Sequence, residues 1–151
     1  MACSLVDRCH EVKQVLQQNA LEKLLCAKTF LQASVDQKLI YAIRYLETEL
    51  KMHQEVRTLW PYLLAIPNRK EANLFCQMYQ CELGQLGEVV QSRIDRLSNS
   101  LKVIQDKMVP AASPSLFWSM MRNQLLEKVG LEAREIITKY ESAGGQVFFN
   151  Y

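Results

Sequence analysis

Proline and glycine are scarce in this 151-residue chain, which has four prolines and five glycines. The first 60 residues contain no proline, and no glycine appears before Gly84. Few sites are therefore available for the tight turns that a many-stranded sheet protein needs. Apolar residues instead recur every three or four positions through most of the sequence, which is the period of an amphipathic helix. The sequence predicts an all-α protein.

The chain also lacks long apolar runs and an excess of one charge. No run approaches the roughly 20 apolar residues that span a bilayer. The 18 Lys and Arg are interleaved with 16 Asp and Glu, which leaves a net charge of +2. We therefore expect neither membrane insertion nor nucleic-acid binding.

The N-terminal sequence and the cysteines bear on the compartment. No apolar segment of the secretory type follows the first residues. The odd number of five cysteines suits a reducing compartment, where cysteine is mostly a small buried apolar residue. We expect a non-secreted protein of the cytoplasm or nucleus, with thiols rather than a disulfide framework.

Start and stop signals divide residues 1–143 into four helices within a single domain. Ser34, three residues before Gln37, marks a turn or kink near Ala33, and Pro61 predicts a kink or an end close to Trp60. The expected helices span residues 5–32, 35–60, 69–108 and 114–142, and residues 144–151 form a flexible apolar tail. We expect antiparallel helical hairpins that form an elongated four-helix bundle or a coiled-coil assembly.

The third expected helix is longer than the others. Forty residues give a rod of roughly 60 Å, against about 40 Å for each of the other helices. Its apolar seam has spacings of three and four residues, as in a coiled coil. Either this seam is an exposed stripe that docks on another chain, or the first two helices stagger to cover it inside a closed bundle. The tail likewise docks on a partner or folds back onto the bundle. The expected protein-interface residues are Leu83, Leu86, Val90, Ile94, Leu97, Leu101, Ile104, Met108, Phe148, Phe149 and Tyr151.

Two glycines lie inside the expected long helix, where each costs about 1 kcal/mol relative to alanine. We interpret Gly84 and Gly87 as a flattened surface on which a bulky side chain such as Trp60 or Trp118 packs; a functional hinge is the alternative. Near the start of the last helix, Trp118 is followed closely by methionines, which form soft and adaptable surfaces. That cluster could lie in the core or in a partner's groove.

Candidate chemistry is sparse. Glu49 and His53 are spaced i, i+4, which fits a pair at the surface or core edge better than a ligand set. Cys76 and Cys81 are five residues apart and would diverge around a continuous helix, so neither a zinc nor a redox spacing is present. We expect no catalytic residue, no cofactor, no metal and no small-molecule substrate.

The expected function is therefore that of a non-enzymatic helical or coiled-coil subunit. It would assemble with other helical protein subunits in a larger intracellular complex of the cytoskeletal, chromosome-segregation or tethering type. The alternative is a self-contained helical-bundle adaptor or regulator, which binds a partner enzyme through its apolar tail or through one end of the bundle.

Overall fold

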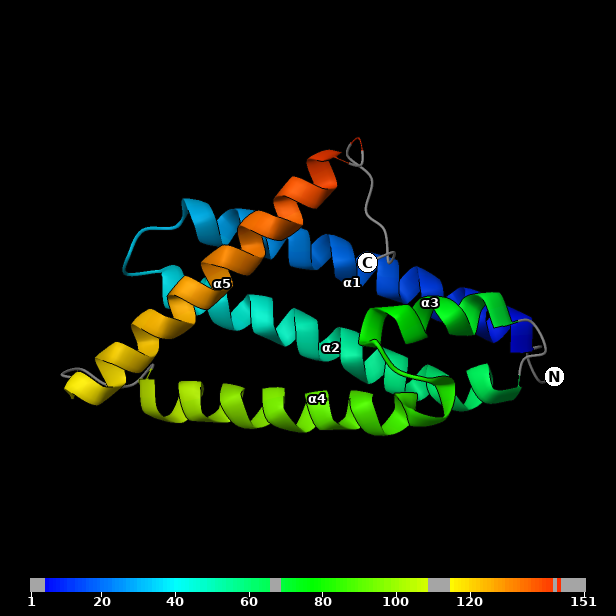
Figure 1. The fold of residues 1–151 in the computed structure, drawn as a ribbon. Coiled ribbons are helices and arrows are strands. Elements are labelled where there is room, and N and C mark those ends of the chain that lie inside the picture. The colour runs from blue at the N-terminus through cyan, green and yellow to red at the C-terminus, as the bar shows by residue number, and fades with distance from the viewer. Residues whose placement is uncertain (1–4, 66–68, 109–114, 143, 145–151) are drawn as a thin grey trace.

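The chain folds into a bundle of α-helices, which confirms the all-α prediction (Figure 1). The structure is a computed structural model that describes residues 5–65, 69–108, 115–142 and 144. Among these residues it contains helices and no strand. The elements in chain order are α1 (Leu5–Gln32), α2 (Lys38–Ala65), α3 (Arg69–Tyr79), α4 (Leu83–Val103), the π-helical turn η1 (Ile104–Met108) and α5 (Leu116–Ser142).

A tight turn joins α1 to α2, close to the turn predicted at Ala33. The carbonyl oxygen of Ser34 accepts hydrogen bonds from the backbone N–H groups of Gln37 and Lys38, both at 3.0 Å. Lys38 Nζ donates to the carbonyl oxygen of Phe30 at 2.9 Å, so this side chain satisfies a backbone acceptor at the end of α1. The predicted bounds of the first helix are confirmed, and the second helix begins three residues later than expected.

The expected end of the second helix at residue 60 is wrong, because α2 continues through Pro61 to Ala65; the alternative of a kink close to Trp60 stays a prediction. Proline in a helix interior costs about 3 kcal/mol, since it removes one hydrogen bond and crowds the preceding turn. Leu59 and Leu63, on either side of Pro61, are fully buried. Burying each leucine contributes roughly 1.5–3 kcal/mol. This gain offsets the cost of the proline.

The predicted single helix 69–108 is also wrong, because it is interrupted after Tyr79. Gln80 has a left-handed backbone with φ of 53°, and the preceding helix ends there. Glu82 is extended, and α4 starts at the next residue. Figure 1 shows that α3 lies beside α4 instead of continuing its line. The break lets apolar side chains from both helices reach the same core.

The core consists of two clusters along the bundle, with α2 contributing to both. We name them cluster A and cluster B. Cluster A consists of Val56, Leu59, Leu63, Ala72, Phe75, Tyr79, Leu86 and Val90. Cluster B consists of Ala27, Phe30, Ala42, Ile43, Tyr45, Leu46, Leu101, Ile104, Met108, Val129 and Ala133.

The last helix, α5, crosses obliquely over α1 and α2 in Figure 1, and its start lies at the end of η1. The expected start of this helix at residue 114 lies outside the described residues, and its end at 142 is confirmed.

No described helix combines the length and the apolar content that a bilayer span requires.

Candidate functional site

The predicted interface seam lies mainly inside the chain's own core. Leu86 and Val90 belong to cluster A, and Leu101, Ile104 and Met108 belong to cluster B. The other three seam residues are partly buried and pack against the same clusters; they are Leu83, Ile94 and Leu97.

This placement corrects the expectation of an exposed stripe and agrees with the closed-bundle alternative. The break after Tyr79 is the physical reason, since it removes the expected surplus length. The 21 residues of α4 and the five of η1 now face a partner helix, α2, of 28 residues. The predicted tail residues Phe148, Phe149 and Tyr151 lie outside the described residues, so their role stays a prediction.

Exposed large apolar side chains occur on several helices, and four of them gather on the first two turns of α5. Leu116 is 78% exposed, Phe117 59%, Met120 54% and Met121 38%. We call these four residues the α5 apolar end. The backbone N–H of Trp118 donates to Ser115 Oγ at 3.3 Å, so a serine cap fixes where the helix begins.

Trp118 anchors the α5 apolar end to the core. Its side chain is half-buried and packs against cluster B. Its ring meets that of Phe117 edge to face, with centroids 4.8 Å apart and an interplanar angle of 70°, an arrangement that aromatic pairs favour. The sequence left this cluster open between core and groove, and the structure divides it: Trp118 faces the core, whereas Met120 and Met121 face outward.

A signal for this surface was present in the sequence. Five of the six residues from Leu116 to Met121 are apolar. An amphipathic helix buries only about three or four positions in every two turns. Some of these side chains therefore had to remain outside a single buried face.

A second distinctive feature is a polar group where α2, α3 and α4 meet. His53 Nδ1 lies 2.7 Å from Tyr79 Oη, and His53 Nε2 lies 3.9 Å from Glu49 Oε1. The Arg93 guanidinium lies over the Tyr79 ring, 4.7 Å from its centroid. The prediction that Glu49 and His53 form a core-edge pair is confirmed, since their side chains are 28% and 12% exposed.

His53 is a neutral imidazole at pH 7. Its pKa is lowered to about 4, mainly because burial disfavours the charged ring; Arg93 and Lys23 lower it further, and Glu49 opposes them. A neutral imidazole has one donor and one acceptor nitrogen. Because a carboxylate faces Nε2, we assign the proton to that nitrogen, so that Tyr79 Oη donates to Nδ1. Nδ1 then accepts a hydrogen bond from Tyr79, which ties α2 to α3, and Nε2–H faces the Glu49 carboxylate at 3.9 Å.

A groove of about 530 Å³ opens beside this group, between α2, α4 and α5. Glu132 lines it from α5. Burial and the neighbouring Glu49 raise the pKa of the Glu132 carboxyl, while Lys23, Lys128 and a hydrogen bond with Tyr45 oppose the rise. Acidic and basic side chains thus face one another across the groove. This pairing favours a structural role that links α5 to α2 over a site for a ligand of one charge.

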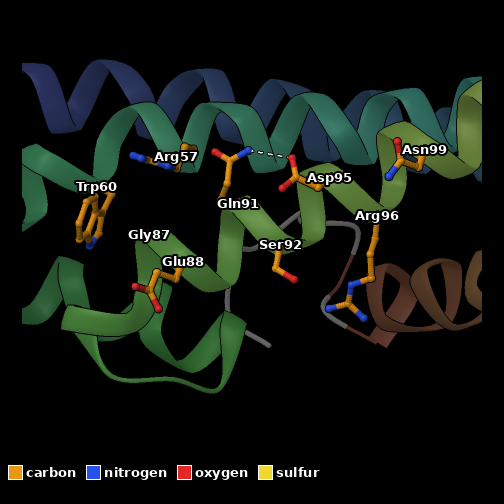
Figure 2. Close-up of a pocket in the computed structure, with 9 residues that line it drawn as sticks. All are labelled: Arg57, Trp60, Gly87, Glu88, Gln91, Ser92, Asp95, Arg96 and Asn99. Atoms are coloured by element: carbon orange, nitrogen blue, oxygen red, sulfur yellow. Dashed lines mark hydrogen bonds between the residues drawn. The ribbon is translucent and has the colours of Figure 1, made fainter.

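A further groove of about 520 Å³ follows α2 and α4 (Figure 2). One wall is Trp60, whose indole N–H donates to the Leu83 carbonyl oxygen at 3.0 Å. Gly87 lies against this ring, and a Cβ atom there would come within 2.9 Å of it. The prediction that a tryptophan packs on a glycine-flattened surface is confirmed for Gly87. Nothing lies within 4 Å of a Cβ placed at Gly84, so the interpretation does not extend to that residue.

The polar side chains of this groove mostly face solvent. Gln91 Nε2 donates to Asp95 Oδ1 at 3.0 Å, a bond within one exposed helix face that Figure 2 shows. The Arg57 guanidinium lies 5.3 Å from the centroid of Trp60, whose ring it covers. These contacts hold the side chains of α2 and α4 in place. The polar groups do not point toward one common position where a ligand could bind.

No family model, curated protein or solved structure matches the chain. Its own geometry is therefore the guide to function. Within the described part of the chain, no three His, Cys, Asp or Glu side chains are grouped so that they could hold a metal ion. The α5 apolar end is the surface that the fold itself does not explain.

Proposed function

We propose that the chain is a self-contained, non-enzymatic helical-bundle adaptor of the cytoplasm or nucleus, which binds a partner protein through the α5 apolar end. The observation that carries the proposal is the exposure of four large apolar side chains on two consecutive turns, with 78% of Leu116 in contact with solvent. Single exposed apolar residues are common on protein surfaces, but a contiguous group is typical of interaction sites. The proposal corresponds to the alternative function expected from the sequence, an adaptor that binds its partner through one end of the bundle.

The composition of this surface favours an apolar helix as the partner's contributing element. Methionine side chains are flexible and polarisable, so Met120 and Met121 can adapt to the side chains of an incoming helix. Phe117 is held against Trp118, which restricts its motion before binding. A restricted aromatic side chain loses less entropy on binding and suits the centre of an interface. The partner helix would present apolar residues at i, i+3, i+4 and i+7.

Site-specific photo-crosslinking tests this proposal. A photoreactive amino acid at Phe117 or Met120 is expected to crosslink a discrete partner in cells of the source organism. The matched control is Leu131, which is 54% exposed on the same helix but outside the α5 apolar end. The double variant Phe117→Ser and Met120→Ser, combined with a photoreactive group at Leu116, should lose the crosslink and keep its melting temperature. Equal crosslinking from Leu131, or a marked loss of stability in the double variant, would contradict the proposal.

Light scattering separates the adaptor from an obligate complex subunit. The clusters of buried side chains are closed within one chain, so we expect the purified protein to be monomeric and to melt in one sharp transition. An obligate subunit would instead self-associate or be insoluble when produced alone. Self-association or insolubility would favour the seam of α4 as an interface with other chains.

A further inference from the structure

The end of α3 has the hydrogen bonds of a Schellman motif. The backbone N–H of Gln80 donates to the carbonyl oxygen of Gln77 at 3.3 Å, and the N–H of Cys81 donates to that of Cys76 at 3.1 Å. Gln80 between them has the left-handed backbone that the motif requires, with φ of 53°. In this motif the side chains at the positions of Cys76 and Cys81 commonly touch across the helix end.

The backbone bond from Cys81 to Cys76 limits the distance between the two cysteines. A Cα atom lies about 1.5 Å from its own nitrogen and about 2.4 Å from its carbonyl oxygen. With the 3.1 Å bond between them, the Cα atoms of Cys76 and Cys81 are at most about 7 Å apart. Any bend along this path brings them closer. Disulfides join Cα atoms about 4.4–6.8 Å apart, so the backbone already holds the pair near that range.

The break in the helix creates this proximity. On a continuous helix, residues five apart are rotated by about 140° and face different sides, as the sequence pattern suggested for these two. The left-handed residue turns the chain back, so that Cys81 returns toward Cys76. Both side chains are half-buried, and therefore part of each is accessible to a small reagent.

We propose that Cys76 and Cys81 form a dithiol site that closes to an intrachain disulfide by exchange with a small-molecule disulfide of the glutathione class. One cysteine thiolate attacks a sulfur of oxidised glutathione, forming a mixed disulfide and releasing one glutathione thiolate. The second cysteine thiolate then attacks the cysteine sulfur of the mixed disulfide. This step forms the Cys76–Cys81 bond and releases the second glutathione. The protein loses two electrons and two protons, and the glutathione disulfide gains both.

Closure of this ring acts on the corner between α3 and α4. Tyr79 lies inside the six-residue loop, and its hydroxyl group bonds His53 of α2. Its ring lies under Arg93 of α4. The disulfide would fix the backbone on both sides of Tyr79, and we expect the oxidised protein to melt at a higher temperature than the reduced one.

The test uses the full-length chain with Cys3, Cys9 and Cys26 replaced by serine, so that only the pair remains. After incubation with oxidised glutathione and an acid quench, mass spectrometry should show a main product lighter by two hydrogen atoms and without bound glutathione. Chymotryptic cleavage after Tyr79 should give two peptides that separate only on reduction. Ring closure should be at least several-fold faster in native buffer than in urea.

Two variants of Gln80 provide matched controls. Gln80→Gly keeps the left-handed backbone accessible and should close as fast as the parent, whereas Gln80→Val disfavours it and should close more slowly. Stable glutathione adducts on both cysteines, or native closure no faster than closure in urea, would overturn the proposal. Comparing the rate of ring closure in native protein and in urea-unfolded protein tests the proposal even if Gln80→Val fails to fold.

Discussion

Substituting Gly87 by alanine tests the packing of Trp60 on α4. In a helix interior, alanine is favoured over glycine by about 1 kcal/mol. The new methyl group, however, would lie 2.9 Å from Cδ2 and Cε3 of the indole ring, closer than carbon atoms approach in folded proteins. The ring cannot move freely, because its N–H is bonded to the Leu83 carbonyl oxygen at 3.0 Å.

The expected magnitude follows from these opposing effects. Overpacking of a well-filled site costs about 1–3 kcal/mol, and loss of the indole hydrogen bond costs a further 0.5–1.5 kcal/mol, roughly. After subtraction of the helix-propensity gain, Gly87→Ala should lower the free energy of unfolding by about 0.5–3.5 kcal/mol. For a chain of this size each kcal/mol lowers the melting temperature by about 2–4 °C. Urea unfolding monitored by tryptophan fluorescence measures the change directly.

Two comparisons make the test specific. Gly84→Ala places its methyl group in open space and should leave stability unchanged or slightly increased. In a Trp60→Phe background, which removes Cε3, Cζ3 and the N–H of the indole ring, Gly87→Ala should cost less than in the parent. If Gly87→Ala proves as stable as Gly84→Ala, or costs the same in both backgrounds, Trp60 does not pack on Gly87 as described.

Other predictions concern the buried polar group and the core. The lowered pKa of His53, about 4 against 6.5 for the unfolded chain, means that the unfolded state binds more protons between these values, so stability should fall as the pH drops from 6.5 to 4. His53→Gln should flatten this dependence in urea titrations, and an unchanged profile would show that His53 is not buried as a neutral ring. Glu132 acts in the opposite sense, since its raised pKa lowers stability above pH 4.5, and Glu132→Gln should increase the urea midpoint at pH 7 more than at pH 4. Leu86→Ala should cost about 2–5 kcal/mol because this side chain is fully buried, whereas Leu131→Ala on the surface should change stability by less than about 0.5 kcal/mol; equal effects would mean that the seam is not internal.

The helical class and most helix ends could be predicted because they depend on local signals. The end of α1 and the turn near Ala33 follow from the helix-start signal of Ser34 and Gln37. The type of contact between Gly87 and Trp60, a large side chain packed on a helical glycine, could also be predicted. A glycine inside a helical segment suggests a close bulky neighbour, which is present at Gly87 and absent at Gly84.

The continuation of α2 and the break after α3 could not be predicted locally, because tertiary packing decides both. Pro61 is a strong local stop signal, yet Leu59 and Leu63 gain more from burial than the proline costs. Conversely, Gln80 is not a residue that marks a helix end. Its left-handed backbone is tolerated because it allows Tyr79 of α3 and Leu86 of α4 to enter the same cluster.

The break after Tyr79 also determines where the chain can meet a partner. With an unbroken helix, the end of the seam near Met108 would extend past α2 and expose apolar residues there. The break shortens this rod to the length of α2, and Met108 is buried in cluster B. The exposed group of apolar side chains then lies on α5, which begins at the end of η1 and crosses the bundle (Figure 1). Its first two turns carry apolar side chains on more than one face, and a crossing helix buries only one of them. Binding through the α5 apolar end should therefore depend on the helix break. A variant that straightens α3 and α4, such as Gln80→Ala with Glu82→Ala, should show weaker photo-crosslinking from Phe117 per folded molecule, and unchanged crosslinking would refute the dependence.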